Sequence, residues 1–493
     1  MSLTLRSPSR YGSLLPVPPT RLILPALALT LACARGPSLA EFPSDRLHFP
    51  AWLAHFTDPT RGDQLLVVNL DQDLAYQDGS LLSLQLPPVA NPSVTGSVGV
   101  PNLAGQLLVL DGSDPLVAGC NFTPNGPAQP NVFTPSVALV AGRLDNNLYA
   151  APLQDGLGKG GMARGLDLEP SGASNPFAVG FSCSADGTPR AWVSYLQGLD
   201  DVGYVTQVNL APDSNGNHPV VQVNVGLGLA RSFAYDPAHD RLYFTGRENS
   251  NRAPLRWIAV GDGCKTFDNG IQDERQGGCH VDPGWDLGAV IRGAEASDLA
   301  LSSAEFPCTA GGFTGNCRRA YLSVRMYDPD LAVLLGGRPV GDIGGKLLVL
   351  ELPEGGLGGP VPQIVGQFDI GIMAGQLQVI PRTGKHDLVA VTAIDDHLLW
   401  LYDDELGAMV KVFGRTEQGL LPLGHRVSGL ASQDQGNGNV WLYVSSYQDH
   451  WVSVVNVPLD DPDQAAVLLD STGNSCSPGV SPCYLHLQPG VAP

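Results

Sequence analysis

Carboxylates recur in the polar turns that separate strand-like segments of this 493-residue chain, and two of these turns carry an Asp-His pair. Carboxylates that converge could bind Ca²⁺, which takes about six to eight oxygen ligands, and a His beside a carboxylate could act as a general base. The turn residues concerned are Asp71, Asp73, Asp78, Asp200, Asp201, Glu248, Asp328, Asp330, Asp395, Asp396, His397, Asp449 and His450.

Turn chemistry offers a simpler explanation for these residues, because Asp side chains accept hydrogen bonds from nearby backbone amides. The nearest fragment of a calcium-binding loop, Asp71-Gln72-Asp73, is not followed by the remaining ligands of such a loop. His397 and His450 recur at equivalent turns, whereas catalysis requires its constellation only once. We therefore expect structural turns and no resident cofactor or metal, with Ca²⁺ as the alternative.

Compact catalytic and nucleotide-binding motifs are absent from the sequence, which contains no G-x-S-x-G, no G-x-x-x-x-G-K-[ST] and no H-E-x-x-H. The formal net charge is -20. Such a surface repels a phosphate backbone, so nucleic acid is excluded as a partner class.

The composition indicates many turns and short strands. The chain has 59 Gly and 41 Pro, and only 15% of its residues are charged. These figures exclude a coiled coil, a long helical bundle and a chain kept disordered by its charge.

A repeat organises the strands that must position the turns. Val440–Asn456 is typical of a strand, a polar turn and a second strand, and Asp387–Leu401 has the same order. In the fourth unit, flanking strands are expected at Arg231–Pro237 and Trp285–Ile291. The earlier strand pairs are Gln64–Asn69 with Ser80–Leu86, Ala191–Leu196 with Tyr204–Leu210, Arg241–Phe244 with Leu255–Val260, and Arg319–Arg325 with Lys346–Leu352.

Four consecutive antiparallel strands per unit, repeated radially, predict an all-β fold consisting of a single β-propeller over residues 45–471. Six or eight blades and a two-sandwich protein remain alternatives. In a propeller, the turns between the second and third strands all open on one face, around the mouth of the central channel. We expect seven four-stranded blades, at about residues 45–96, 97–170, 174–226, 227–292, 293–372, 373–415 and 416–471.

Two phrases resemble the YVTN and NHL families of bacterial propellers. They are Leu442-Tyr-Val-Ser followed by Trp451-Val-Ser-Val-Val, and Phe233-Ala-Tyr-Asp-Pro followed by Asp240-Arg-Leu-Tyr. The similarity covers most of residues 45–471 in rhythm and implies the propeller fold. It leaves the function open, because propellers serve as binding proteins, lactonases, dehydrogenases and scaffolds.

The N-terminus is typical of an export signal, since basic residues precede the apolar run Leu22–Ala32 and no acid occurs before Glu41. Thr30-Leu-Ala-Cys33 resembles a bacterial lipobox, although Thr30 stands where that motif usually has Leu. The resemblance implies a signal peptide at 1–32, lipidation of Cys33 and a tether at 33–44. Ordinary signal cleavage, with Cys33 incidental, is the alternative.

The remaining eight cysteines favour disulfides in an oxidising compartment, because their number is even and no zinc-type spacing occurs. Proximity pairs Cys264 with Cys279, Cys308 with Cys317, and Cys476 with Cys483 in a C-terminal tail at 472–493. Elimination then pairs Cys120 with Cys183.

Together these features favour a non-catalytic, lipid-anchored propeller of the bacterial cell envelope that binds a protein or an envelope polymer through loops on one face. By resemblance, Ala34 after Cys33 favours the outer membrane, facing either the periplasm or the cell surface. One alternative is a metal-assisted, lactonase-like hydrolase with its site at the channel mouth. Another is a structural module of a larger envelope assembly.

Overall fold

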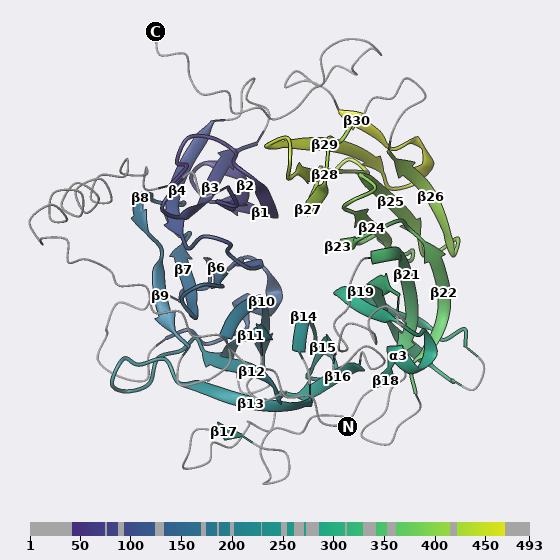
Figure 1. Ribbon diagram of the computed structural model, residues 1–493, viewed down its shortest axis with the longest axis horizontal. Coiled ribbons are helices and arrows are strands. Elements are labelled where there is room, and N and C mark those ends of the chain that lie inside the picture. Colours follow the sequence, from purple (N-terminus) through teal and green to yellow (C-terminus); the bar gives the residue numbers. More distant parts are fainter. Residues whose placement is uncertain are drawn as a thin grey trace, which may run out of the picture. The chain divides into compact units, whose positions relative to one another are not determined.

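The computed structural model describes residues 42–73, 76–86, 93–123, 133–168, 174–184, 187–197, 202–227, 229–247, 254–260, 271–272, 285–310, 313–328, 342–352, 361–414 and 422–468. These residues form seven sheets around a central axis, so the prediction of an all-β, seven-bladed propeller with four-stranded blades is confirmed (Figure 1). The predicted signal peptide, Cys33 and the C-terminal tail lie outside the described residues. Among the residues described, no helix is long and apolar enough to cross a membrane.

Within each blade the first strand lies next to the axis, and the following strands lie successively farther out, with the fourth at the rim of the propeller. Blade 1 has β1 (Pro50–Asp58), β2 (Gly62–Asn69), β3 (Gly79–Gln85) and β4 (Val94–Val100), and blade 2 has β5 (Leu107–Leu110), β6 (Val137–Gly142), β7 (Asn147–Pro152) and β9 (Arg164–Asp167). Blade 3 has β10 (Ser174–Cys183), β11 (Pro189–Gln197), β12 (Val202–Asn209) and β13 (Val220–Leu227), and blade 4 has β14 (Leu229–Asp236), β15 (Arg241–Arg247), β16 (Pro254–Ala259) and β18 (Trp285–Asp286).

The last three blades follow the same plan. Blade 5 has β19 (Ala294–Pro307), β20 (Asn316–Tyr327), β21 (Asp342–Leu352) and β22 (Gln363–Asp369), and blade 6 has β23 (Ala374–Ile380), β24 (Leu388–Ala393), β25 (Leu398–Asp403) and β26 (Ala408–Phe413). Blade 7 has β27 (Val427–Asp434), β28 (Asn439–Ser446), β29 (Trp451–Pro458) and β30 (Ala466–Leu468). The short helices are α2 (Pro115–Ala118), α3 (Leu287–Val290) and η3 (Pro462–Gln464).

Two sheets gain a fifth strand in parallel at the rim. β8 (Lys159–Met162), which lies between the third and fourth strands of blade 2 in the sequence, pairs with β4 of blade 1. β17 (Ile271–Gln272) pairs in the same way with β13 of blade 3. Blades 1 and 3 are therefore extended by residues that belong to the neighbouring repeat.

Two of the expected boundaries are wrong. The limit between the first and second blades does not fall at residue 96, because β4 continues to Val100. The strand expected at Trp285–Ile291 ends at Asp286, whose carboxylate accepts the amide of Gly288 at 3.0 Å and starts α3. An Asp in this position satisfies an amide that the first helical turn leaves free, so it stops the strand and begins a helix.

The innermost strands share a local irregularity at the axis. Six of the seven shift their register against the second strand of their blade, as a β-bulge does, which lets a strand bend and twist more strongly. The shifts lie at Pro50/Trp52, Pro176/Val179, Ala230/Phe233, Ala296/Asp298, Ala374/Leu377 and Val427/Leu430.

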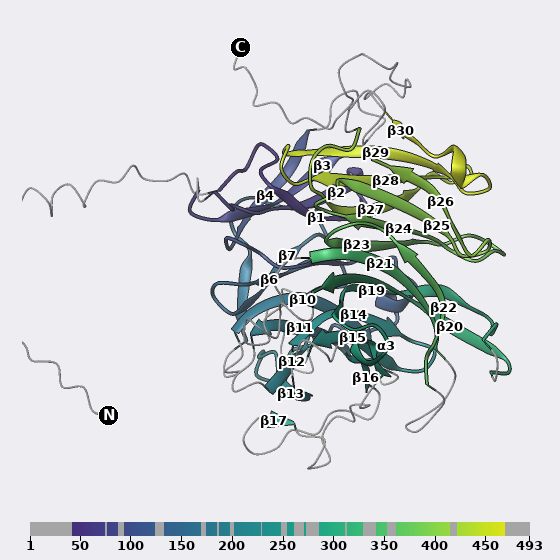
Figure 2. The ribbon, with the colours of Figure 1, turned by 45° about the vertical axis from the view of Figure 1, so that its right-hand side comes forward.

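The ring closes where the last blade meets the first, with β27 packed beside β1 (Figure 1, Figure 2). Tyr443 of blade 7 lies in one hydrophobic cluster with Leu53 and Leu65 of blade 1. The Gln433 side-chain amide also donates to Asp63 Oδ2 across the same boundary at 2.7 Å. Side-chain packing therefore joins the two ends of the described propeller.

Two disulfides occur among the described residues, and both are pairs that the sequence suggests. Cys120, which follows α2, is bonded to Cys183 at the end of β10, so the bond ties blade 2 to blade 3. Cys308 and Cys317 close the hairpin between β19 and β20. The other two expected pairs, Cys264 with Cys279 and Cys476 with Cys483, lie outside the described residues.

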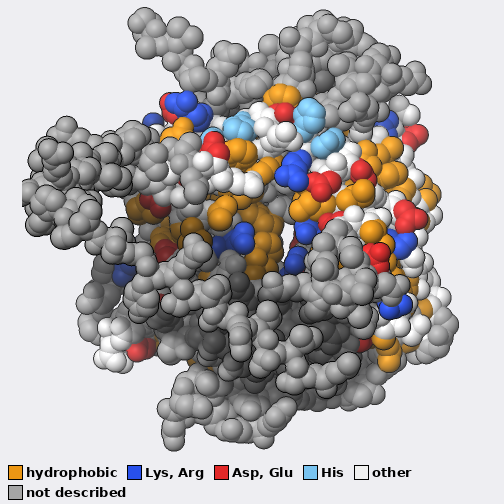
Figure 3. Space-filling view, viewed as in Figure 1, with side chains coloured by type: hydrophobic (Ala, Val, Ile, Leu, Met, Phe, Trp, Pro, Cys, Tyr) orange, Lys and Arg blue, Asp and Glu red, His pale blue; other side chains and the backbone are white. Residues whose placement is uncertain are grey.

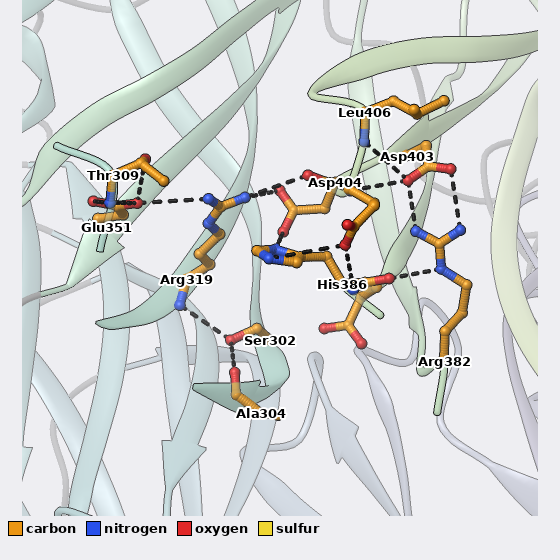
Figure 4. Close-up of polar contacts among 12 residues, drawn as sticks. Ser302, Ala304, Thr309, Arg319, Glu351, Arg382, His386, Asp403, Asp404 and Leu406 are labelled. Carbon is orange, nitrogen blue, oxygen red and sulfur yellow. Dashed lines mark hydrogen bonds and ion pairs between the residues drawn. The ribbon is translucent and has the colours of Figure 1, made fainter. Parts of the chain in front are cut away.

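A buried ionic network joins blades 5 and 6 (Figure 4). It lies at the ends of the strands that are opposite to the turns between the second and third strands of the blades. The Arg319 guanidinium contacts the carboxylate of Asp404 and lies 3.5 Å from Glu351, and none of the three side chains is more than 8% exposed. Glu351 also accepts the backbone amide of Thr309 at 2.8 Å, and His386 Nδ1 lies 2.9 Å from Asp404. A buried network of this kind tolerates the loss of one member poorly.

Replacing Arg319 with Met should lower the free energy of unfolding by about 3–5 kcal/mol, because Asp404 and Glu351 would be left as buried charges without their cation. Urea unfolding followed by circular dichroism measures the change. As a control, Lys385→Met removes a cation that pairs with Asp460 on the surface and should leave the midpoint nearly unchanged. Equal losses in the two variants would contradict the assignment.

Candidate functional site at the channel mouth

The turns between the second and third strands of the blades, called here the b–c turns, lie on one face of the propeller, the b–c face. Figure 3 shows several His side chains gathered on this face. All the described candidates lie in the b–c turns of blades 1, 5, 6 and 7. Asp78, directly before β3, and Asp328, directly after β20, are half-buried. The predicted residues Asp200, Asp201, Glu248 and Asp330 lie outside the described residues.

Asp396 and Asp449 hold equivalent b–c turns against the segment that leads into the innermost strand of the same blade. Asp396 Oδ2 accepts the backbone amide of Ile372 at 2.7 Å, and Asp449 accepts both the backbone amide and the ring nitrogen of His425. The neighbouring Asp395 forms an ion pair with Arg426 at 3.0 Å. These contacts favour the structural interpretation of the two repeated carboxylates.

His397 and His450 follow these carboxylates and reach toward the next blade. His397 Nδ1 accepts the backbone amide of Arg426, at the start of blade 7, at 2.9 Å. The His450 ring centre lies 4.4 Å from that of Phe49, at the start of blade 1. Both His residues have a left-handed backbone, with φ of 61° and 63°, and Asn146 has φ of 61° at the equivalent position of blade 2. His and Asn are among the residues that tolerate this conformation best.

The side chain of His48 lies beside those of two predicted turn residues, Asp71 and Asp73. His48 itself is not among the residues predicted from the sequence. Potential ligand atoms of the three side chains lie within 4.8 Å of one another. His48 Nε2 is 2.9 Å from Asp73 Oδ1 and 3.6 Å from Asp71 Oδ1, and the Asp71 carboxylate also accepts the amide of Tyr76 at 3.1 Å. One imidazole and two carboxylates form a donor set suited to a divalent cation. The same hydrogen bonds also serve to hold the turn.

A cavity of about 290 Å³ lies in the central channel. Innermost strands and the first residues of the b–c turns form its wall, and basic side chains border the central hollow in Figure 3. The apolar and aromatic part of the wall includes Trp52, Phe177, Met373, Ile394 and Tyr447. The basic part consists of Arg143, Arg231, Arg325 and Arg426.

The four arginines cannot be predicted as a group from the sequence, because each comes from a different blade and no motif contains two of them. One positional signal does exist. Arg143, Ile394 and Tyr447 each hold the first position of a b–c turn, in blades 2, 6 and 7, and all three line the cavity. An alignment of the repeats would have identified this position as one that faces the channel.

No protein-family model and no curated protein matches this chain. Among solved structures it is similar to apo AztD from Citrobacter koseri, with 10% identity over 85% of both chains and a TM-score of 0.39. It is also similar to the periplasmic gluconolactonase PpgL of Pseudomonas aeruginosa, with 13% identity over 86% of both chains and a TM-score of 0.35. A Synechocystis apocarotenoid oxygenase shares 11% identity over 87% of this chain and 91% of its own, with a TM-score of 0.40. These similarities concern the fold alone.

The two turn histidines should make stability depend on pH. Burial, and the charges of His425 and His48 respectively, lower the pKa of His397 and His450 from the ordinary value of 6.5. The unfolded chain therefore takes up protons at a higher pH than the folded chain, so the wild type loses stability as pH falls through about 6.5.

A variant with both His397→Asn and His450→Asn should lose less stability than the wild type between roughly pH 7.5 and pH 5.5, because two of the groups that titrate differently on unfolding are gone. Asn suits the left-handed backbone at both sites. The urea midpoint measured at each pH tests this expectation. Parallel pH profiles for the two proteins would refute it.

Proposed function

We propose that the protein is a lipid-anchored β-propeller of the bacterial cell envelope that binds a protein or an envelope polymer through its b–c face, without catalysing a reaction. The observation that carries this proposal is the fixed array of polar side chains on that face. His397, His425, His450 and His48, from blades 6, 7 and 1, are held by hydrogen bonds and ring contacts beside an open cavity. Groups fixed before binding lose little entropy when a partner arrives.

The compartment is supported by the two disulfides, since such bonds persist mainly in oxidising environments. Anchoring rests on the lipobox-like segment that ends in Cys33, and placement in the outer membrane rests on Ala34. An anchor followed by a short tether would hold the propeller close to a membrane, where an envelope polymer or a membrane protein is within reach.

A metal-assisted hydrolase, in the manner of a lactonase, is the second candidate. The grouping of His48 with Asp71 and Asp73 favours it. It ranks second because the Asp71 carboxylate accepts a backbone amide and Asp73 is hydrogen-bonded to His48, so both carboxylates already hold the turn.

Replacing Cys33 with Ser should move the protein from the membrane fraction to the soluble fraction of the envelope, because the lipid-bearing thiol is lost. Cell fractionation and the intact mass of the mature protein measure the effect. Ser38→Ala, in the same tether, is the matched control and should remain with the membrane. A Cys33→Ser protein that still fractionates with membranes would refute the anchor.

The binding face can be tested by photo-crosslinking in intact cells from two exposed positions of blade 7. A benzoylphenylalanine at Gln448, in the b–c turn, should give a discrete cross-linked adduct with the partner. The same group at Asn437, in the turn between the first and second strands at the opposite face, should not. The same adducts from both positions, or none from Gln448, would argue against a partner on the b–c face.

A further inference from the structure

The channel cavity concentrates positive charge in a protein that is acidic as a whole. The chain carries 28 Lys and Arg residues against 48 Asp and Glu, yet four arginines line this one cavity of about 290 Å³. Clustered cations repel one another unless anions lie between them. The positive charge of this cavity, inside a protein of negative net charge, therefore needs an explanation.

Two of the four arginines are balanced by carboxylates. Arg231 Nε lies 2.6 Å from Glu295, whose side chain is 1% exposed. Arg426 pairs with Asp395 at 3.0 Å near the mouth of the channel. In each of these two pairs a carboxylate within 3.0 Å offsets the charge of the arginine.

Arg143 and Arg325 form no close ion pair of this kind with any described residue. Arg143 Nε donates to the Asn175 side chain at 2.9 Å, and its guanidinium carbon lies 5.9 Å from the centre of the Phe177 ring. Arg325 Nε donates to the carbonyl of Ala374 at 3.2 Å and acts on Asp342 only through longer-range attraction. Within the described part of the chain, no carboxylate lies within 4.0 Å of either guanidinium.

Among the described residues of the cavity wall there is one carboxylate, Asp298, and its oxygens already accept hydrogen bonds from other groups. Its oxygens accept hydrogen bonds from Ser232 Oγ at 2.6 Å and from the backbone amides of Leu299 at 2.9 Å and Leu377 at 2.8 Å. Burial also raises the pKa of this carboxyl. Conversely, burial and the charge of Arg231 lower the pKa of Arg143, so the positive charge of Arg143 is unfavourably placed in the free protein.

We propose that this cavity binds a small organic anion, with a carboxylate, phosphate or sulfonate group held by Arg143 and Arg325 and an apolar body against Trp52 and Phe177. Guanidinium groups bind such oxyanions through paired hydrogen bonds, which strengthen where water is excluded. The volume lies at the lower end of the range typical of small-molecule pockets. The acidic exterior disfavours polyanions, so the site selects a compact ligand.

This site is distinct from the proposed macromolecular function and does not depend on it. A small molecule in the channel requires neither the lipid anchor nor a partner on the b–c face. Purified protein is therefore sufficient for the test, and its outcome is independent of fractionation and cross-linking.

Isothermal titration with naphthalene-2-carboxylate tests the inference, with the neutral naphthalene-2-carboxamide as a probe of the same shape. The carboxylate should bind saturably at one site, and the carboxamide at least about tenfold more weakly, since a charge-assisted hydrogen bond contributes that much or more. Arg143→Gln and Arg325→Gln should each weaken carboxylate binding by a similar factor and leave carboxamide binding unchanged. Arg164→Gln, which replaces an exposed arginine on β9, should alter neither.

Thermal unfolding of the free variants separates a binding role from a structural one. Removing Arg143 relieves repulsion from Arg231, so Arg143→Gln should be at least as stable as the wild type while binding the carboxylate less tightly. Equal affinity for carboxylate and carboxamide, or no saturable carboxylate binding, would overturn the proposal. So would undiminished carboxylate binding by Arg143→Gln, and Arg325→Gln provides the same comparison if that variant does not fold.

Discussion

The geometry of the innermost strands is the constraint on which the rest of the propeller depends. Seven strands approach a common axis, and six of them are irregular near the same point, which frees backbone amides from the ladder. A buried amide without an acceptor is costly, so each must find one nearby. Hydroxyls on the second strands supply acceptors: Ser194 for Ala178 at 2.9 Å, Thr392 for Gln376 at 3.0 Å and Ser445 for Gly429 at 2.7 Å.

The same irregularity links neighbouring blades and builds the channel wall. Asp298 of blade 5 accepts the amide of Leu377 in blade 6, and the Gln376 side chain accepts the amide of Leu430 in blade 7. Gln376 also donates to the carbonyl of Ala51, beyond blade 7 in blade 1. Asp298 and Gln376 both line the channel cavity. Asp298 and Gln376 in the cavity wall therefore already have partners, whereas no carboxylate of the described residues lies within 4.0 Å of Arg143 or Arg325.

The repeat made the fold predictable, because alternating strands and polar turns are encoded locally in each blade. The strand at Trp285–Ile291 was predicted wrongly, since an apolar run cannot reveal that Asp286 caps a short helix. Asp71 and Asp73 could be placed in a turn, but His48 could not be placed beside them, because a different segment brings it there. The channel arginines were missed for the same reason, as the axis gathers single residues from separate blades.

One strand shows how the surroundings decide what an arginine does. β20 carries Arg319 near its start and Arg325 near its end, an even number of residues apart and hence on the same face of the strand. Arg319 lies between Asp404 and Glu351, so its charge is balanced within the protein and it serves to join two blades. Arg325 reaches the channel, where a backbone carbonyl is its hydrogen-bond acceptor. A carbonyl accepts a hydrogen bond without neutralising the cation, and Asp342 attracts Arg325 only at longer range, so this arginine keeps positive charge in the channel wall where Arg319 does not.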